Sequence, residues 1–303
     1  MAFDDVTAAQ RLEYTGNVQL ALQQKKNYLE MCATYQPNLT GRQARVVELF
    51  GARGYKKNPP RGGTLQPTGG TIEQVWCKPT HIVTDEWVLE DEDKFKNMTD
   101  YQSSYVQSDA ATIHRAKNEI LADALIAARI IGEDGTDTAA FSNPNGSVAV
   151  NYVPTGAATD SGLTVPKIVK GLELLELGEV DVENEEIFLR CTSTQITNLY
   201  NDLMFTNKDY RDRAVLDEAR KSVREILNVK IIRQPNALVP KASTTRACTL
   251  FAKSGLAYGD FMPVESHIGR SIERFDRVVG FSEMWCGATR MEDAKFVTVD
   301  CKE

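Results

Sequence analysis

A long amphipathic helix is predicted over residues 108–131, and it limits the possible folds of this 303-residue chain more than any other feature. Its apolar residues recur at the three- and four-residue spacing of one helical face, namely Ala110, Ile113, Ala116, Ile120, Leu121, Ala124, Leu125 and Ala128. Ser108 or Asp109 can cap its start, and Gly132 and Gly135 follow its end. At about 1.5 Å per residue the helix is about 36 Å long, which suits a scaffold that spans the molecule.

Strand-like segments surround this helix without the regular alternation of strand and helix that builds a doubly wound sheet. Three further helices are predicted, over residues 14–35, 164–177 and 193–203, and a fourth over 214–227. Strands are predicted over 43–50, 71–76, 81–88, 147–153, 186–191, 230–233 and 246–253, and two or three longer ones over 268–301, with candidate turns at Gly280 and Gly287–Arg290. The fold class is therefore α+β.

The segment 51–70 is rich in turn-forming residues, because nine of its twenty residues are Gly or Pro. Strand-like sequence lies on both sides, so we expect two strands that flank a long projecting loop. Loops this long inside a compact domain are usually functional or disordered. No acidic residue occurs between Glu48 and Glu73, whereas four basic residues do: Arg53, Lys56, Lys57 and Arg61.

Charge is unevenly distributed along the chain, whose net charge is −7. Residues 85–93 contain six acids in nine positions, and residues 173–186 contain seven acids and no base. Residues 207–246 carry ten bases and five acids. These segments either pair between copies of the chain or are ordinary solvated faces and intramolecular pairs. Because the net charge is negative, the chain is not expected to be a protein that wraps nucleic acid with its whole surface.

Motifs for catalysis and for ligand binding are missing from the sequence. It has no phosphate-binding loop of the GxxxxGK[ST] type, no HExxH, no GxSxG and no GxGxxG after a strand. Its six cysteines and three histidines lack the spacing of a zinc site, so we expect reduced thiols, no metal site, no cofactor and no catalytic residues. We also expect neither a signal peptide nor a membrane-spanning segment.

Three segments together resemble a major capsid protein of tailed double-stranded DNA bacteriophages with the Hong Kong 97-like fold. The first is Asn17–Lys25, which contains a Gln-Gln pair like the opening helix of one subgroup. The second runs from Asp91–Lys94 through Tyr105 to His114–Ile120, similar to the acidic approach and start of a long "spine" helix. The third is Gly287–Arg290 followed by Phe296–Cys301, similar to the closing strands.

The resemblance implies a division of the chain into five parts. Residues 1–44 would be an N-terminal arm, and residues 45–84 an extended loop that reaches over a neighbouring subunit. Residues 85–164, with the spine helix 108–131, and the closing strands 263–303 would form a peripheral domain. Residues 165–262 would form an axial domain that meets its copies around five-fold and six-fold vertices.

The resemblance also implies a function. The chain would be a structural protein that self-assembles into pentamers and hexamers, forming an icosahedral virion shell around double-stranded DNA without sequence-specific binding. Assembly would take place in the host bacterial cytoplasm, with a portal protein and, because little chain precedes the arm helix, a separate scaffolding protein. Two alternatives remain: a bacterial nanocompartment shell of the same fold that encloses a cargo enzyme, and a cytosolic enzyme of unrecognised family.

The uneven charge predicts one contact between subunits. We expect the loop residues Arg53, Lys56, Lys57 and Arg61 to dock on an acidic patch of an adjacent subunit, formed by Glu90, Asp91, Glu92 and Asp93. Exposed charge pairs contribute little affinity individually, so such a contact would mainly set register and specificity.

Overall fold

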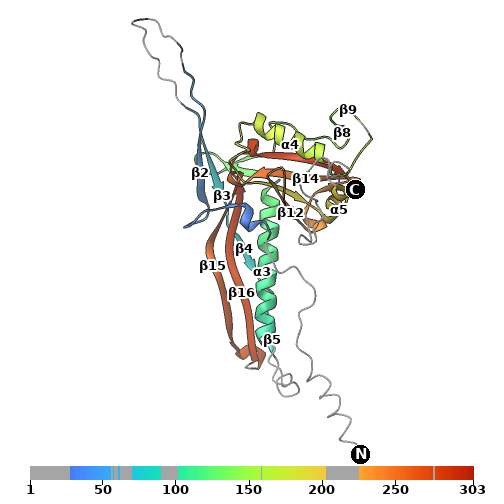
Figure 1. The fold of residues 1–303 in the computed structure, drawn as a ribbon. Coiled ribbons are helices and arrows are strands. Elements are labelled where there is room, and N and C mark those ends of the chain that lie inside the picture. Colours follow the sequence, from blue (N-terminus) through green and yellow to red (C-terminus); the bar gives the residue numbers. More distant parts are fainter. Residues whose placement is uncertain are drawn as a thin grey trace, which may run out of the picture.

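The computed structural model describes residues 28–55, 57, 61, 70–89, 102–157, 159–202, 225–275 and 277–303. A long spine of one helix and a sheet carries a broader body at one end, and a narrow hairpin projects from their junction (Figure 1). The architecture is α+β, as the sequence predicts.

The spine is formed by helix α3 (Gln102–Ala124) packed against a five-stranded sheet. Two long antiparallel strands, β15 (Leu256–Ser271) and β16 (Arg277–Arg290), run beside the helix for most of its length. The short strands β4 (Thr80–Val83) and β5 (Trp87–Leu89) pair with β16, and β1 (Thr34–Tyr35) pairs in parallel with β15. With 23 residues, α3 is about 34 Å long, and its last turn lies next to the body.

The body is built on a six-stranded sheet. Its strands are β11 (Glu225–Ile226), β12 (Val229–Arg233), β10 (Ile187–Cys191), β14 (Thr245–Ala252), β13 (Lys241–Ala242) and β17 (Phe296–Lys302). Helix α4 (Val165–Leu177) packs on β17, and α5 (Ser193–Tyr200) follows β10. Strands β8 (Tyr152–Val153) and β9 (Gly156–Ala157) form a separate small hairpin. The closing strands therefore divide between two sheets, because β16 lies in the spine and β17 in the body.

The projecting hairpin belongs to a four-stranded sheet of the order β2–β3–β6–β7. Strand β2 (Ala44–Phe50) pairs with β3 (Ile72–Cys77) in antiparallel fashion, as predicted for the strands that flank the loop. Strands β6 (Arg129–Ile131) and β7 (Asp137–Ala139) complete the sheet directly after α3.

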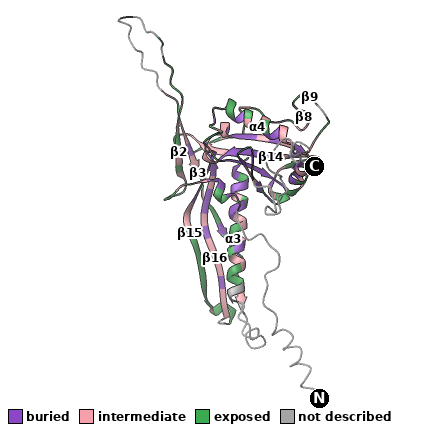
Figure 2. Cartoon of the chain, viewed as in Figure 1, coloured by how far each residue is buried: buried purple, intermediate pink, exposed green. Residues whose placement is uncertain are grey.

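Two hydrophobic clusters form the core. One lies in the body between α4, α5 and the six-stranded sheet, and it includes Ile168, Leu175 and Leu250. The other joins the inner face of α3 to the spine sheet and includes Leu121 and Met284. Buried residues run through the strands of the body, whereas along the spine they lie on the faces where the helix and the strands meet (Figure 2).

The boundaries of the spine helix differ from the prediction over 108–131. The helix starts at Gln102, so Ser108 and Asp109 lie inside it and do not cap it. It ends at Ala124, because the chain turns there and residues 129–131 become an inner strand of the hairpin sheet. Local periodicity cannot show this change, since Ala and Ile suit either structure at the end of an apolar run.

Other predictions were wrong in detail. Residues 30–35 form a short 3₁₀-helix (Glu30–Cys32) and strand β1 instead of the end of a helix, whose residues 14–27 lie outside the described part.

Gly280 and Gly287 lie within β16 instead of at turns. A Cβ atom at Gly280 would come within 2.3 Å of the Trp87 ring, and one at Gly287 within 2.6 Å of the Cys77 sulfur. These glycines therefore allow close packing of neighbouring strands. The helix predicted over 214–227 lies outside the described residues up to 224, and its end is strand β11.

Candidate assembly surfaces

The β2–β3 hairpin exposes apolar side chains where it leaves the body. Phe50 and Ile72 face each other in the register and are 62% and 59% exposed, and Tyr55 further out is 79% exposed. The backbone N–H of Gly51 donates to the carbonyl of Thr71 at 2.8 Å, which continues the pairing past Phe50. A two-stranded ribbon with exposed aromatic residues is marginal in water on its own, so it is suited to packing against another surface.

The base of this hairpin is firmly attached to the molecule. The indole N–H of Trp76 donates to the carbonyl of Gly132 at 2.7 Å. Arg129 bridges two parts of the chain, since its guanidinium lies 2.8 Å from the carboxylate of Glu73 and donates to the carbonyl of Met291 at 2.7 Å. The hairpin therefore projects from a fixed base.

The predicted basic contact residues lie on the hairpin. Arg53, Lys57 and Arg61 are exposed, and the ammonium of Lys57 lies 5.6 Å from the centre of the Tyr55 ring. Lys56 lies outside the described residues. The predicted acidic partners Glu90, Asp91, Glu92 and Asp93 also lie outside them, so the contact between these two groups stays a prediction.

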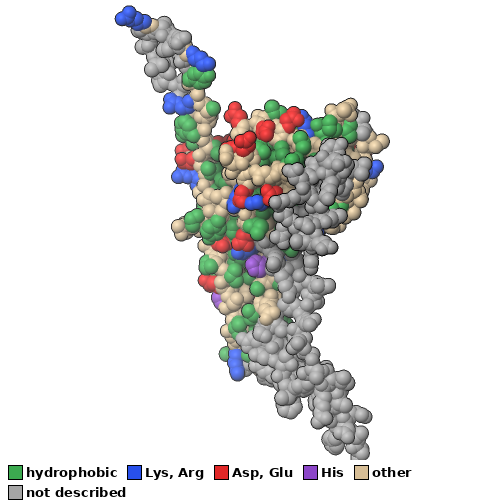
Figure 3. Space-filling view, in the orientation of Figure 1, with side chains coloured by type: hydrophobic (Ala, Val, Ile, Leu, Met, Phe, Trp, Pro, Cys, Tyr) green, Lys and Arg blue, Asp and Glu red, His purple; other side chains and the backbone are tan. Residues whose placement is uncertain are grey.

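The acidic stretch 173–186 has two kinds of surroundings. Glu186 accepts hydrogen bonds from Lys230 and, at 2.7 Å, from Lys253, and these contacts lower the pKa of its carboxyl group to about 2. The intramolecular alternative therefore holds for Glu186, and also for Glu173, whose carboxylate accepts a hydrogen bond from Lys170 at 2.6 Å. The other acids gather over α4 and the loop that follows it, on the outer face of the body (Figure 3). Most of the predicted basic counterpart, 207–246, lies outside the described residues.

The end of the spine helix is held by two buried arginines that sequence reasoning did not single out. The guanidinium of Arg190, from β10, donates to the carbonyl of Ala122 at 3.0 Å. That of Arg290, from β16, donates to the carbonyls of Ala124 and Ala127 at 3.2 and 2.8 Å. The last carbonyls of a helix lack partners within it and carry partial negative charge, so both arginines stabilise the helix end.

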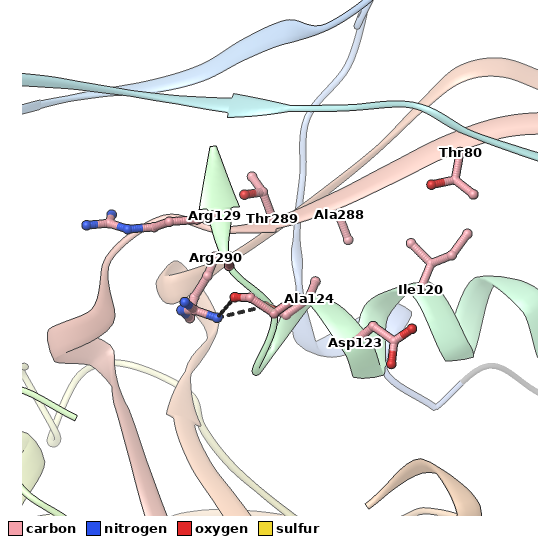
Figure 4. Close-up of a pocket in the computed structure, with 10 residues that line it drawn as sticks. Thr80, Ile120, Asp123, Ala124, Arg129, Ala288, Thr289 and Arg290 are labelled. Carbon is pink, nitrogen blue, oxygen red and sulfur yellow. Dashed lines mark hydrogen bonds between the residues drawn. The ribbon is translucent and has the colours of Figure 1, made fainter. Parts of the chain in front are cut away.

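A cavity of about 260 Å³ lies beside this junction, between α3, β4 and β16 (Figure 4). Small side chains form much of its wall, including Ala124, Ala127 and Ala288. Figure 4 shows the Arg290 guanidinium directed at Ala124, while the Arg129 guanidinium extends away from the cavity. The guanidinium groups of Arg129 and Arg290, which line this cavity, are therefore both engaged by other groups of the protein.

The cysteine side chains of the described chain are shielded from solvent. All six cysteines are buried, and burial raises the thiol pKa of Cys32, Cys77, Cys191 and Cys286 to about 12. Among the described residues, no group of three or more His, Cys, Asp and Glu side chains is arranged to hold a metal ion. No described helix is both long and apolar enough to cross a membrane.

Two of the three histidines share one carboxylate on the solvent face of the spine sheet. His81 and His267 lie 2.9 and 3.1 Å from the two carboxylate oxygens of Glu283, and the His81 ring stacks on Trp285. Both hydrogen bonds lower the pKa of the Glu283 carboxyl group, and the one to His81 has the larger effect. The arrangement joins β4, β16 and β15 and is a cross-strand clamp.

Comparisons with known proteins agree with this architecture. The sequence matches the phage capsid protein family over residues 6–303. No curated protein matches the chain in sequence.

Solved capsid structures share the fold. The capsid of cyanophage Pam1 has a TM-score of 0.69 at 12% identity, covering 95% of each chain. That of Ralstonia phage GP4 has a TM-score of 0.68 at 10% identity, covering 95% of this chain and 94% of that one. The capsid of a native GTA particle, computed with C5 symmetry, has a TM-score of 0.64 at 10% identity and covers all of both chains. The resemblance to Hong Kong 97-like capsid proteins is therefore confirmed, and this chain belongs to the phage capsid protein family.

Proposed function

We propose that this capsid protein assembles with copies of itself into pentamers and hexamers that close into an icosahedral shell around double-stranded DNA. The observation that carries the proposal is the family match over residues 6–303, together with a fold shared over nearly the whole chain. The shape supports it, because a long spine and a projecting hairpin give one subunit several separate contact surfaces (Figure 1). Many weak contacts of this kind add up to a stable assembly, since each subunit is held by several neighbours.

The parts of the fold have different roles in this proposal. The body built on the six-stranded sheet would be the axial domain, which meets its copies within a ring. The spine of α3, β15 and β16 would be the peripheral domain at the outside of the ring. The β2–β3 hairpin would be the extended loop that reaches a neighbouring subunit, and residues 1–44 the arm. Strand β17 would tie the chain's last residues into the axial domain.

We propose a structural role without catalysis. The buried, high-pKa thiols and the histidines engaged by Glu283 support this, because nucleophilic and general-base chemistry need accessible groups with matched pKa values. The acidic net charge of −7 suits a container better than a tight DNA binder. Packed DNA could then leave the shell without breaking many phosphate contacts.

Assembly would take place in the host cytoplasm with two further proteins, a scaffolding protein and a portal protein. The first would direct closure at the correct size, and the second would provide the opening for DNA. Both are proposed from the resemblance to tailed-phage capsid proteins.

The test is light scattering behind a size-exclusion column, with negative-stain electron microscopy of the largest species, on the protein expressed alone and with candidate scaffolding proteins. Closed shells of uniform size, or rings of five and six, are expected. A monomer or dimer under every co-expression condition would contradict the proposal. DNA content distinguishes a genome container from a shell filled with a protein cargo.

A further inference from the structure

A groove of about 410 Å³ lies on the spine sheet at the base of the projecting hairpin. It is lined by Gly41 and Arg42 before β2, by Lys78 and Pro79 after β3, and by Phe261, Met262 and Trp285 of β15 and β16. The neighbours of Trp285 in its strand, Met284 and Cys286, belong to the hydrophobic cluster under α3. Because side chains alternate along a strand, Trp285 and the groove lie on the sheet face that α3 does not cover.

The apolar part of the groove results from an irregularity in β15. The pairing register with β16 shifts between Asp260 and Met262, and again between Met262 and Glu265. A β-bulge disturbs the alternation of side chains, so the adjacent residues Phe261 and Met262 both line the groove. Its size and its aromatic lining are those of a site that binds a ligand or a peptide side chain.

Two cations at the groove have no partner within the described chain. Arg42 and Lys78 are exposed, and no hydrogen bond or ion pair between described residues engages either side chain. Glu283, which lies on the same face of β16 as Trp285, is already engaged by two histidines. An occupant that combines an apolar side chain with two acids would therefore complement the groove in both shape and charge.

The chain itself contains a segment with this chemistry. The projecting hairpin is a poor occupant, because its exposed cations would repel those of the groove (Figure 3). Residues 1–6 read Met-Ala-Phe-Asp-Asp-Val, so two consecutive acids lie between two apolar residues. This segment lies outside the described residues. The match to the phage capsid protein family begins at residue 6, so residues 1–5 lie outside the part that the family shares.

The segment is close enough in the chain to reach the groove of its own subunit. The described chain begins at Tyr28, and Gly41 of the groove follows after 13 residues. The groove therefore lies within about 45 Å of Tyr28, whereas residues 7–27 span about 70 Å when extended. A segment linked in this way has an effective concentration in the millimolar range, so even a weak contact would be formed.

We propose that the segment 3–6 docks in this groove of its own subunit. The Phe3 ring would lie against Trp285, and the two acids would lie beside Arg42 and Lys78. The contact would cover an apolar groove of the subunit before it meets other molecules. The proposal goes beyond the shell function and does not depend on it, because the contact is formed within one chain.

The first test is a disulfide between the segment and the groove in the unassembled protein. Ala2→Cys with Pro79→Cys is expected to form an intrachain disulfide on mild oxidation with diamide, identified by mass spectrometry of proteolytic fragments. Ala2→Cys with Lys302→Cys is the matched control, because Lys302 is exposed on the body, and its disulfide is expected to form at least about tenfold more slowly. The six native cysteines are buried and should not compete.

The second test removes the chemistry of the segment. Phe3→Ser, Asp4→Asn and Asp5→Asn, added together to the cysteine pair at positions 2 and 79, should slow the cross-link about tenfold, as expected for a loss of about 1.4 kcal/mol. Glu13→Gln with Tyr14→Ser is the matched control. It also removes an acid and an aromatic ring from the first 27 residues, and the cross-link rate should stay unchanged.

Three results would overturn the proposal. The first is an equal cross-link rate for the cysteine pairs 2/79 and 2/302, and the second is a rate that the triple substitution does not change. The third comes from mixing the single variants Ala2→Cys and Pro79→Cys. Cross-linked dimers that form as fast as the intrachain disulfide would place the segment on a second copy instead of its own subunit. Shell formation is measured separately, so its failure would contradict the proposed function without changing these results.

Discussion

Three long cationic side chains are almost completely buried in the described part of the chain, those of Lys167, Arg190 and Arg290, and each donates to at least two backbone carbonyls. The Lys167 side chain is fully buried, and its ammonium donates to the carbonyls of Val150, Ser161 and Asp300 at 2.7, 2.8 and 2.9 Å. Burial lowers its pKa, and also lowers that of Arg190 to about 10. None of these roles could be predicted from the sequence, because Lys or Arg on a helix or strand is usually exposed and its partners here are distant in the chain.

Lys167→Met should show how much this buried ammonium contributes. The variant leaves three carbonyls without a donor, while it removes the cost of burying a charge. We expect the free energy of unfolding to fall by about 3 kcal/mol, measured by urea denaturation of the unassembled protein. The control is Lys170→Met on the same helix, where the lysine pairs with Glu173 at the surface, and we expect a change of at most about 0.5 kcal/mol. Equal losses in both variants would contradict the assigned role.

Glu186 gives the molecule a specific sensitivity to acid. Its folded pKa of about 2 lies below the ordinary value of 4.5, since Lys230 and Lys253 stabilise the carboxylate. A group with a lowered folded pKa contributes stability above its unfolded pKa, and this contribution is lost as the pH falls from about 4.5 to about 2. Glu186→Gln should therefore flatten the decline of the urea midpoint over this range. The exposed Glu183→Gln variant should follow the wild-type curve, and a Glu186→Gln curve that does so too would disprove the effect.

At the scale of elements, local signals predicted some helices and strands well and others poorly. The helix over 164–177 is confirmed as α4, because Pro166 near its start and Gly178 at its end mark both boundaries within the sequence itself. The predicted bounds of the spine helix, 108–131, lie six residues too late at the start and seven too late at the end. The end could not be predicted locally, since it depends on Arg190 and Arg290 and on the sheet pairing of residues 129–131. The long strands β15 and β16 were only partly predicted, because their turn lies at 272–276 and glycine within a strand resembles a turn signal.

The buried face of α3 can be tested with two adjacent residues. Leu121 is fully buried against the spine sheet, whereas Ile120 is only partly buried. Leu121→Ala should lower the free energy of unfolding by about 3 kcal/mol, because it removes buried methyl groups and leaves a cavity. Ile120→Ala should cost about half as much, since water already reaches part of that side chain. Chemical denaturation of both variants checks the order, and a larger loss at Ile120 would mean that the helix faces the sheet differently.

At the scale of the whole molecule, the sequence predicted the projecting basic hairpin but could not show what it touches. The Gly- and Pro-rich segment between two strands places Arg53, Lys57 and Arg61 far from the body, on a ribbon whose apolar residues are exposed. The acidic segment 90–93 was predicted as the partner from charge alone. A contact between copies leaves no trace in the periodicity of one chain, which is why this part of the site could not be derived further.

Reversing the four loop cations tests the contact at this scale. We expect the variant with Arg53, Lys56, Lys57 and Arg61 all changed to Glu to lose closed shells, because the loop would then repel an acidic neighbour. Its thermal midpoint should stay close to that of the wild type, since the described members of the set are exposed and lie outside both hydrophobic clusters. Light scattering and electron microscopy measure assembly, and calorimetry of the unassembled protein measures folding.

Two companion variants identify the partner. Changing the four cations to Gln should reduce assembly less than changing them to Glu, because it removes attraction without adding repulsion. Reversing Glu90, Asp91, Glu92 and Asp93 to Lys in the same chain as the Glu-substituted loop should restore shells, since every subunit then carries both reversed partners. Shells from the Glu-substituted loop alone at wild-type yield would show that the loop does not need its charge. Failure of the double reversal, with both single reversals inactive, would instead mean that the loop binds a different acidic surface of its neighbour.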